Sequence, residues 1–184
     1  MAAAKADAPD RPVELWAFDE HRLGLKPLAR RVWARRGQRP VAISTHKYKW
    51  LYLYGFVRPA TGAVEWWLAS SVNVPLFQAV LDSFAATVGA GPEKTVILLL
   101  DGAGWHASPR LRIPDGVRLQ FLPPYTPELQ PAEHLWPLAD ETVANRPFAS
   151  LDQLTDALDQ RCSALTDDPA FIKANTNFNW WPAE

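Results

Sequence analysis

The sequence predicts a mixed α/β sheet flanked by helices and folded as one domain. Three observations predict this class. Tyr48–Val57 alternates aromatic with other residues at the period of a strand. Pro75–Val88 repeats apolar residues at helical spacing. Thr95–Leu100 is a short apolar run that stops at Asp101-Gly102, as a buried strand would. With 184 residues, 48% of them hydrophobic, the chain can bury a substantial core.

The chain begins with two expected strands. Leu15–Phe18 is an apolar run that leads directly into Asp19 and Glu20. Arg31–Ala34 is expected to form a short strand, followed by a turn at Arg36-Gly37-Gln38. Residues 1–14 are rich in Ala, Pro and charge and have no period. We expect them to be a linker or the truncated remnant of a longer region, with the folded domain over residues 15–184.

A hairpin is expected next. Arg58–Gly62 has the composition of a turn, and it joins Tyr48–Val57 to a return strand over Ala63–Ala69. We interpret the aromatic stripe of the first strand as core rather than as a surface that stacks on bases.

The middle of the chain predicts a helix over Pro75–Val88, ended by Gly89–Pro92, and then the buried strand Thr95–Leu100. A short helix is expected after Ser108, followed by a strand near Val117–Leu122.

Two helices are expected towards the end. The first begins at Gln130, with Glu133 as its third residue and a kink caused by Pro137. The last begins at Ser150, with Gln153 as the partner in a capping box. This order of strands and helices matches a ribonuclease-H-like architecture, in which the first strand lies beside the fourth. Asp19 is therefore expected next to Asp101.

Composition excludes several classes of protein. The single Cys162 cannot form an intramolecular disulfide framework or a four-cysteine zinc site. No apolar run approaches the roughly 18–20 residues of a membrane span, and the first residues lack a signal-peptide core, so we expect a cytoplasmic protein without membrane contact. No glycine-rich phosphate loop is present, so hydrolysis of nucleoside triphosphates has no support.

Charge is distributed unevenly although the net charge is −1. Between His21 and Trp50 lie nine of the 19 Lys and Arg residues and no acid. Such a stretch is typical of a surface that binds a polyanion. It is equally typical of an ordinary solvated surface whose charge is balanced by the acidic C-terminal end.

Three acids stand where strands end or a helix begins: Asp19, Asp101 and Glu133. Adjacent carboxylates repel each other unless a cation or proton lies between them, and oxygen ligands favour Mg²⁺ or Mn²⁺ over zinc. Two such ions would suit in-line displacement at phosphorus. Each acid also has an ordinary interpretation, because Asp19 can cap a turn, Asp101-Gly102 is a common turn pair, and Glu133 can simply complement a helix dipole.

The segments around these acids resemble a known family. Leu99-Leu100-Asp101-Gly102-Ala103-Gly104-Trp105-His106 and the stretch from Leu122-Pro123-Pro124-Tyr125 to Ala132-Glu133-His134-Leu135-Trp136 are similar to the catalytic core of bacterial insertion-sequence transposases of the Tc/mariner superfamily. Phe18-Asp19-Glu20 matches the first-acid motif of that family, and Val32–Gln38 resembles its following Trp-basic-Gly segment. The resemblance runs from about Leu15 to Trp181.

This resemblance implies a ribonuclease-H-like endonuclease domain that cleaves DNA and transfers strands with Asp19, Asp101 and Glu133 as catalytic and metal-binding residues. It implies Mg²⁺ or Mn²⁺, two ions in all, and DNA as partner, both transposon ends and target, in a homodimeric active complex. Glu20, His106 and His134 are expected to support the acids. We expect the following basic residues to contact DNA phosphates: Arg30, Arg31, Arg35, Arg36, Arg39 and Lys47.

The sequence departs from the family in four ways. The 31 residues between Asp101 and Glu133 are at the short end for the family, and Gln130 stands where Asn is usual. The segment after Glu133 is acidic rather than basic, and the helix-turn-helix region expected upstream is absent from these residues. Two alternatives therefore stay open. The chain could be another ribonuclease-H-like nuclease, or a truncated or domesticated copy that binds DNA or protein without cutting.

Overall fold

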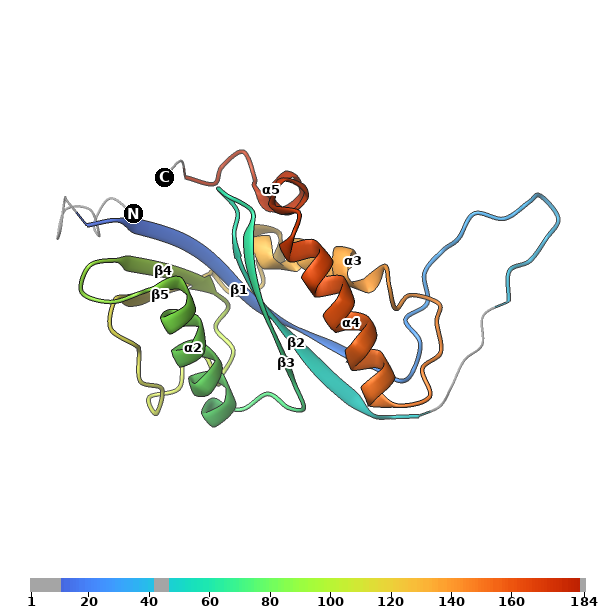
Figure 1. Cartoon of the computed structure of the whole chain (residues 1–184), viewed down its shortest axis with the longest axis horizontal. Coiled ribbons are helices and arrows are strands. Elements are labelled where there is room, and N and C mark those ends of the chain that lie inside the picture. The colour runs from blue at the N-terminus through green and yellow to red at the C-terminus, as the bar shows by residue number, and fades with distance from the viewer. Residues whose placement is uncertain (1–10, 42–46, 183–184) are drawn as a thin grey trace.

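The computed structural model describes residues 11–41 and 47–182 and has a five-stranded sheet at its centre (Figure 1). Its strands are β1 (Val13–Gly24), β2 (Trp50–Arg58), β3 (Ala63–Ala69), β4 (Thr95–Leu100) and β5 (Val117–Phe121). They lie in the order β3-β2-β1-β4-β5. β1, β2 and β3 are antiparallel neighbours, whereas β4 pairs in parallel with both β1 and β5. The predicted placement of the first strand beside the fourth is confirmed.

Helices cover both faces of this sheet. α2 (Val74–Val88) packs on one face, and α3 (Leu135–Asp140), α4 (Leu151–Thr166) and α5 (Pro169–Thr176) pack on the other. β1 shows why two cores form, because its side chains alternate between the faces. Trp16 and Phe18 join the α2 core, whereas Leu15 and Ala17 join the core beneath α3, α4 and α5.

Local sequence signals account for the ends of the two longest helices. The Asn73 side chain accepts a hydrogen bond from Leu76 N–H at the start of α2, and Gly89 ends it in the left-handed region with φ of 69°. Ser150 Oγ accepts from Gln153 N–H at the start of α4, while Gln153 Oε1 accepts from Ala149 N–H. The predicted capping pair is therefore present. The side chain of Gln153 accepts from the backbone N–H of Ala149, whereas in a standard capping box it would accept from that of Ser150.

Three sequence predictions about the elements are wrong. Arg31–Ala34 forms no strand: all residues from 31 to 41 are exposed in a loop that projects from the body (Figure 1), so the segment has no sheet edge to pair with. No helix follows Ser108, where a single turn closes through Leu111 N–H and Pro114 disfavours helical backbone before it. β1 spans Val13–Gly24, so it is longer at both ends than the strand expected over Leu15–Phe18. Residues 1–10 of the expected linker lie outside the described part of the chain.

The segment that carries Glu133 also differs in detail. It is a 3-10 helix, η2 (Pro131–His134), which passes directly into α3, after a shorter 3-10 helix, η1 (Pro127–Leu129). Pro137 lies in the first turn of α3, where its missing N–H costs no helical hydrogen bond. The backbone changes from 3-10 to α geometry before Pro137, at the junction of η2 and α3. α5, with Asp168 as its cap and Pro169 in its first turn, was not predicted.

Candidate active site

Asp19 lies on β1, on the face covered by α3. Its Oδ2 accepts a hydrogen bond of 3.0 Å from the indole Nε1 of Trp136. Burial raises the pKa of Asp19, the bond from Trp136 opposes this change, and the negative charge of Glu133 adds to it. The resulting pKa is about 7. Asp19 therefore carries a proton part of the time near neutrality, and a nearby positive charge would favour its ionised form.

Asp101 follows the last residue of β4, at the carboxyl end of a parallel strand. The paired register of β1 and β4 ends at Ala17 and Leu99, two residues before Asp19 and Asp101 respectively. Beyond these pairs, Asp19 and Asp101 both line the same cavity. Asp101 Oδ1 accepts hydrogen bonds from His106 Nδ1 at 2.6 Å and from Ala103 N–H at 3.1 Å. These bonds, that of His106 above all, hold the pKa of Asp101 below its usual value.

Glu133 comes from a third segment, η2, and its side chain is exposed. Asp19, Asp101 and Glu133 line one cavity of about 370 Å³, together with Tyr125 and Gln130 among other residues. The strand rim and η2 thus bring together the three acids that the sequence singled out, although Asp19 and Asp101 are far apart in the chain.

His106 contacts Asp101 from the face of the sheet covered by α2, where its ring lies against Phe18 and Phe77. Its side chain is fully buried, and its Nε2 lies 2.8 Å from Glu20 Oε1. Burial alone would lower the pKa of His106, but its bonds to Asp101 and Glu20 raise that pKa to about 9. His106 is thus a cation that joins two carboxylates. His134 lies apart from the cavity lining, with its ring edge-on to Phe178 at a centroid distance of 4.7 Å.

Three residues that form hydrogen bonds in the site were not among the predicted site residues. Gln130 is buried and donates from Nε2 to the backbone carbonyl of Phe18 at 2.9 Å, so it ties η2 to β1 beside Asp19. Trp105 Nε1 donates to Glu20 Oε1 at 2.6 Å, and Trp136 donates to Asp19. Each of these residues lies within four positions of Asp101 or Glu133 in the sequence, and this closeness was the signal that could have identified them.

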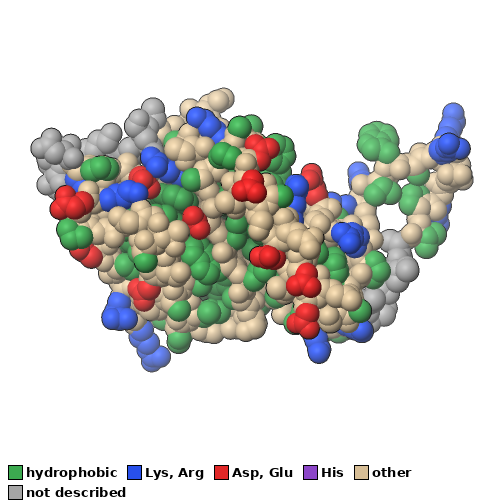
Figure 2. Space-filling view, in the orientation of Figure 1, with side chains coloured by type: hydrophobic (Ala, Val, Ile, Leu, Met, Phe, Trp, Pro, Cys, Tyr) green, Lys and Arg blue, Asp and Glu red, His purple; other side chains and the backbone are tan. Residues whose placement is uncertain are grey.

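The basic residues of the projecting loop have different surroundings. Arg31, Arg35, Arg36 and Arg39 are exposed, and Figure 2 shows Lys and Arg side chains at the end of the loop. Lys47 Nζ donates to the carbonyl of Ala149 at 3.1 Å.

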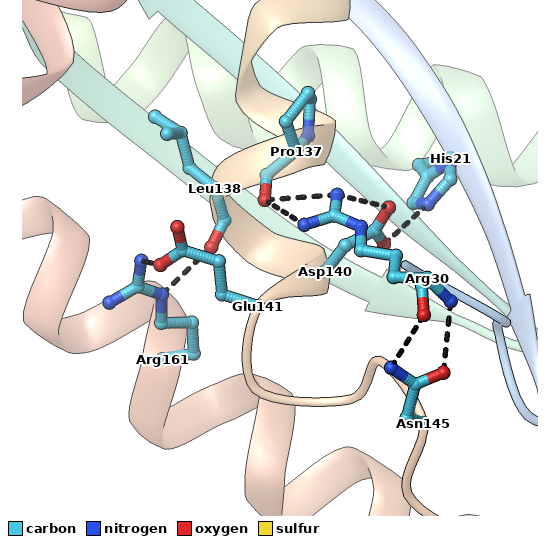
Figure 3. A network of polar contacts seen from close by, with 8 residues as sticks. All are labelled: His21, Arg30, Pro137, Leu138, Asp140, Glu141, Asn145 and Arg161. Atoms are coloured by element: carbon cyan, nitrogen blue, oxygen red, sulfur yellow. Dashed lines mark hydrogen bonds and ion pairs between the residues drawn. The ribbon is translucent and has the colours of Figure 1, made fainter. Parts of the chain in front are cut away.

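Arg30 instead sits at the root of the loop and contacts α3 (Figure 3). Its guanidinium donates to the carbonyl of Pro137 at 3.2 Å and to Asp140 Oδ2 at 3.3 Å. Its backbone exchanges two hydrogen bonds of 2.9 Å with the side chain of Asn145. Arg30 is therefore an anchor within the fold, which the sequence prediction of a phosphate contact did not foresee.

The donor chemistry of the cavity fits a divalent cation. Asp19, Asp101 and Glu133 offer only hard carboxylate oxygens, which suit Mg²⁺ or Mn²⁺. Among the described residues, no group of three or more His, Cys, Asp or Glu side chains, as these side chains stand, could hold a metal ion. In residues 11–41 and 47–182, no helix is both long and apolar enough to cross a bilayer.

Comparisons with known proteins place this arrangement in a family. Residues 14–155 match the family model described as "DDE superfamily endonuclease". An uncharacterised protein of Sinorhizobium fredii, y4pE/y4sA, is 33% identical over 121 residues, which cover 65% of this chain and 88% of that protein.

Solved structures show the same fold. The Mos1 mariner paired end complex with Mn gives a TM-score of 0.60 at 19% identity over 88% of this chain and 53% of that chain. The simian T-cell lymphotropic virus intasome gives 0.53 at 16% identity over 83% of this chain and 48% of that chain. This chain thus spans about half the length of those proteins. With a ribonuclease-H-like sheet, three acids around one cavity and a match over most of its length, the chain belongs to the DDE superfamily endonucleases.

Proposed function

We propose that this chain is the catalytic domain of a DNA transposase, which cuts DNA and joins a 3′ hydroxyl to a target strand. One observation carries the proposal: Asp19, Asp101 and Glu133, from β1, the end of β4 and η2, line a single cavity at the rim of the sheet. Metal use is supported by two similar solved structures, the Mos1 mariner paired end complexes with Mn and with Mg.

The chain's own groups would have distinct parts in this reaction. Asp19, Asp101 and Glu133 would hold Mg²⁺ or Mn²⁺, two ions in the full proposal. When bound, such a cation favours ionisation of the attacking water or hydroxyl and stabilises charge on the leaving oxygen. His106 keeps Asp101 ionised and oriented, because it donates to Oδ1 and is itself held by Glu20. Gln130 keeps η2, and with it Glu133, against β1.

We further propose a homodimeric active complex in the cytoplasm, acting on transposon ends and target DNA. Support comes from another similar solved structure, the Mos1 transposase paired-end complex with left transposon end. Arg31, Arg35, Arg36, Arg39 and Lys47 would contact phosphates, with Arg30 holding the root of the loop that presents them.

Purified protein and supercoiled plasmid test the enzyme class. We expect nicking that requires Mn²⁺ or Mg²⁺ and is lost in Asp101→Asn. Glu128→Gln is a matched control, because Glu128 is exposed on η1 and does not line the cavity. Joined products with a labelled 3′ end would separate a transposase from a nuclease that only hydrolyses. Metal-independent nicking, or equal nicking by Asp101→Asn, would contradict the proposal, and no nicking at all would favour a non-catalytic remnant.

A further inference from the structure

A hydrogen bond from Trp136 on α3 reaches Asp19 on β1. Trp136 is the second residue of α3, three residues after Glu133, and its side chain is buried at 5% exposure. Its indole Nε1 donates to Asp19 Oδ2 at 3.0 Å. An indole N–H has no acceptor role and does not titrate in the physiological range, so this bond gives Asp19 a fixed donor on one of its two oxygens.

The ring of Trp136 has little freedom to move. Gly55 is the residue of β2 that pairs with Asp19, and a Cβ at position 55 would lie 2.9 Å from the edge of the Trp136 ring. His21 stacks on the face of the Trp136 ring at a centroid distance of 5.2 Å and an interplanar angle of 14°. The ring of Trp136 therefore meets Gly55 of β2 with its edge and lies face to face with an imidazole two residues beyond Asp19 on β1.

Asp140 holds that imidazole in turn (Figure 3). It lies one helical turn after Trp136 on α3, is 6% exposed, and its Oδ1 lies 2.9 Å from His21 Nε2. Its Oδ2 accepts from Arg30. A buried carboxylate requires such partners, and here they also join α3 to β1 and to the root of the projecting loop.

We propose that Trp136 and Asp140 are positioning residues for Asp19: Trp136 orients the carboxylate directly, and Asp140 holds Trp136 through His21. The inference rests on the proposed function, because it assigns these residues to the metal-binding step. Groups that orient a ligand to a metal commonly alter metal affinity tenfold or more when they are lost. Trp136 and Asp140 thus set how readily Asp19 binds a divalent cation, without touching that cation or the DNA.

Trp136→Phe tests the direct contact, since it keeps a ring for packing and removes the N–H. The chain offers a matched control in Trp66→Phe, because Trp66 Nε1 is buried and has no hydrogen-bond partner among residues 11–41 and 47–182. Mn²⁺ binding is measured by electron paramagnetic resonance of the free ion, and folding by circular dichroism in EDTA. We expect the Mn²⁺ dissociation constant to rise about tenfold or more in Trp136→Phe and to stay within twofold of the parent in Trp66→Phe.

Gly55→Ala displaces the same ring without removing any polar atom, because its new Cβ meets the Trp136 ring. We expect it to weaken Mn²⁺ binding as Trp136→Phe does, and we expect Asp140→Asn to weaken it less. Plasmid nicking gives a second readout: a positional defect is rescued by raising the Mn²⁺ concentration, whereas a purely structural defect is not. DNA affinity in EDTA should stay unchanged in all of these variants.

The outcomes separate the two proposals. A folded Trp136→Phe or Gly55→Ala protein that binds Mn²⁺ like the parent overturns the positioning role and leaves the proposed function standing. Reduced nicking in these variants that Mn²⁺ does not restore also overturns it. A parent that binds no Mn²⁺ overturns the proposed function and, with it, the role given to Trp136 and Asp140.

Discussion

Gln130 is the residue whose replacement tests most directly how η2 is attached to the sheet. β4 ends its pairing beside Ala17, and the next carbonyl of β1, at Phe18, accepts a hydrogen bond from Gln130 Nε2 at 2.9 Å. Gln130 Oε1 also accepts from Ala132 N–H, the start of η2, at 3.4 Å. The side chain is 4% exposed, so water cannot readily replace it at either partner.

The change Gln130→Leu keeps the approximate volume of the side chain and removes both bonds. A buried carbonyl left without its donor costs about 1–3 kcal/mol, and loss of a capping acceptor costs about 1 kcal/mol more. The second bond is long, so we expect about 2–3 kcal/mol in the free energy of unfolding. For a chain of this size, this corresponds to a fall of roughly 4–12 °C in the melting temperature.

Urea unfolding followed by circular dichroism measures this loss, and Gln120→Leu serves as the control. Gln120 is exposed on β5, and within the described residues its side chain bonds only to the carbonyl of Phe121, so its replacement should change stability by no more than about 0.5 kcal/mol. Equal stability of the two variants would refute the reasoning. We also expect Gln130→Leu to weaken Mn²⁺ binding, because Glu133 lies on the segment that Gln130 holds.

Three further predictions concern other parts of the molecule. Burial raises the pKa of Glu14, but its bonds from Lys94 and Trp16 outweigh this and leave it below the ordinary value of 4.5. Glu14→Gln should thus lower the free energy of unfolding by about 1 kcal/mol at neutral pH. This loss should be complete above pH 4.5 and disappear as the pH falls through the lowered pKa of Glu14. A loss that persists at about pH 2–3 in urea titrations would contradict this. Replacing Arg35 and Arg36 by Ala should reduce the slope of log affinity for DNA against log salt by about 2, and an unchanged slope would assign them to ordinary surface. Arg30→Ala should instead lower the melting temperature by a few degrees, because it leaves buried Asp140 with fewer partners, and thermal scans against Arg31→Ala check this.

Much of the fold was predictable because its signals are local. Thr95–Leu100 was predicted with its observed bounds, since a continuous apolar run between turn residues leaves little choice for a strand that is covered on both faces. α2 and the start of α4 followed from apolar periodicity and from capping side chains within three residues of the helix start. The proximity of Asp19 and Asp101 followed from the strand order, which is confirmed.

Only the tertiary structure decided the contacts that complete the site. Arg31–Ala34 has the composition of a strand but no neighbouring edge, and a strand is stable only through such pairing. Arg30 belonged to a basic run, yet Asp140, 110 residues away, accepts its hydrogen bond. Trp136 bonds Asp19 across 117 residues, and Gln130 bonds Phe18 across 112. Periodicity and caps report on neighbours within a few positions of the chain, whereas the partner of a buried polar group depends on which distant segments the packed core brings within about 3 Å of it.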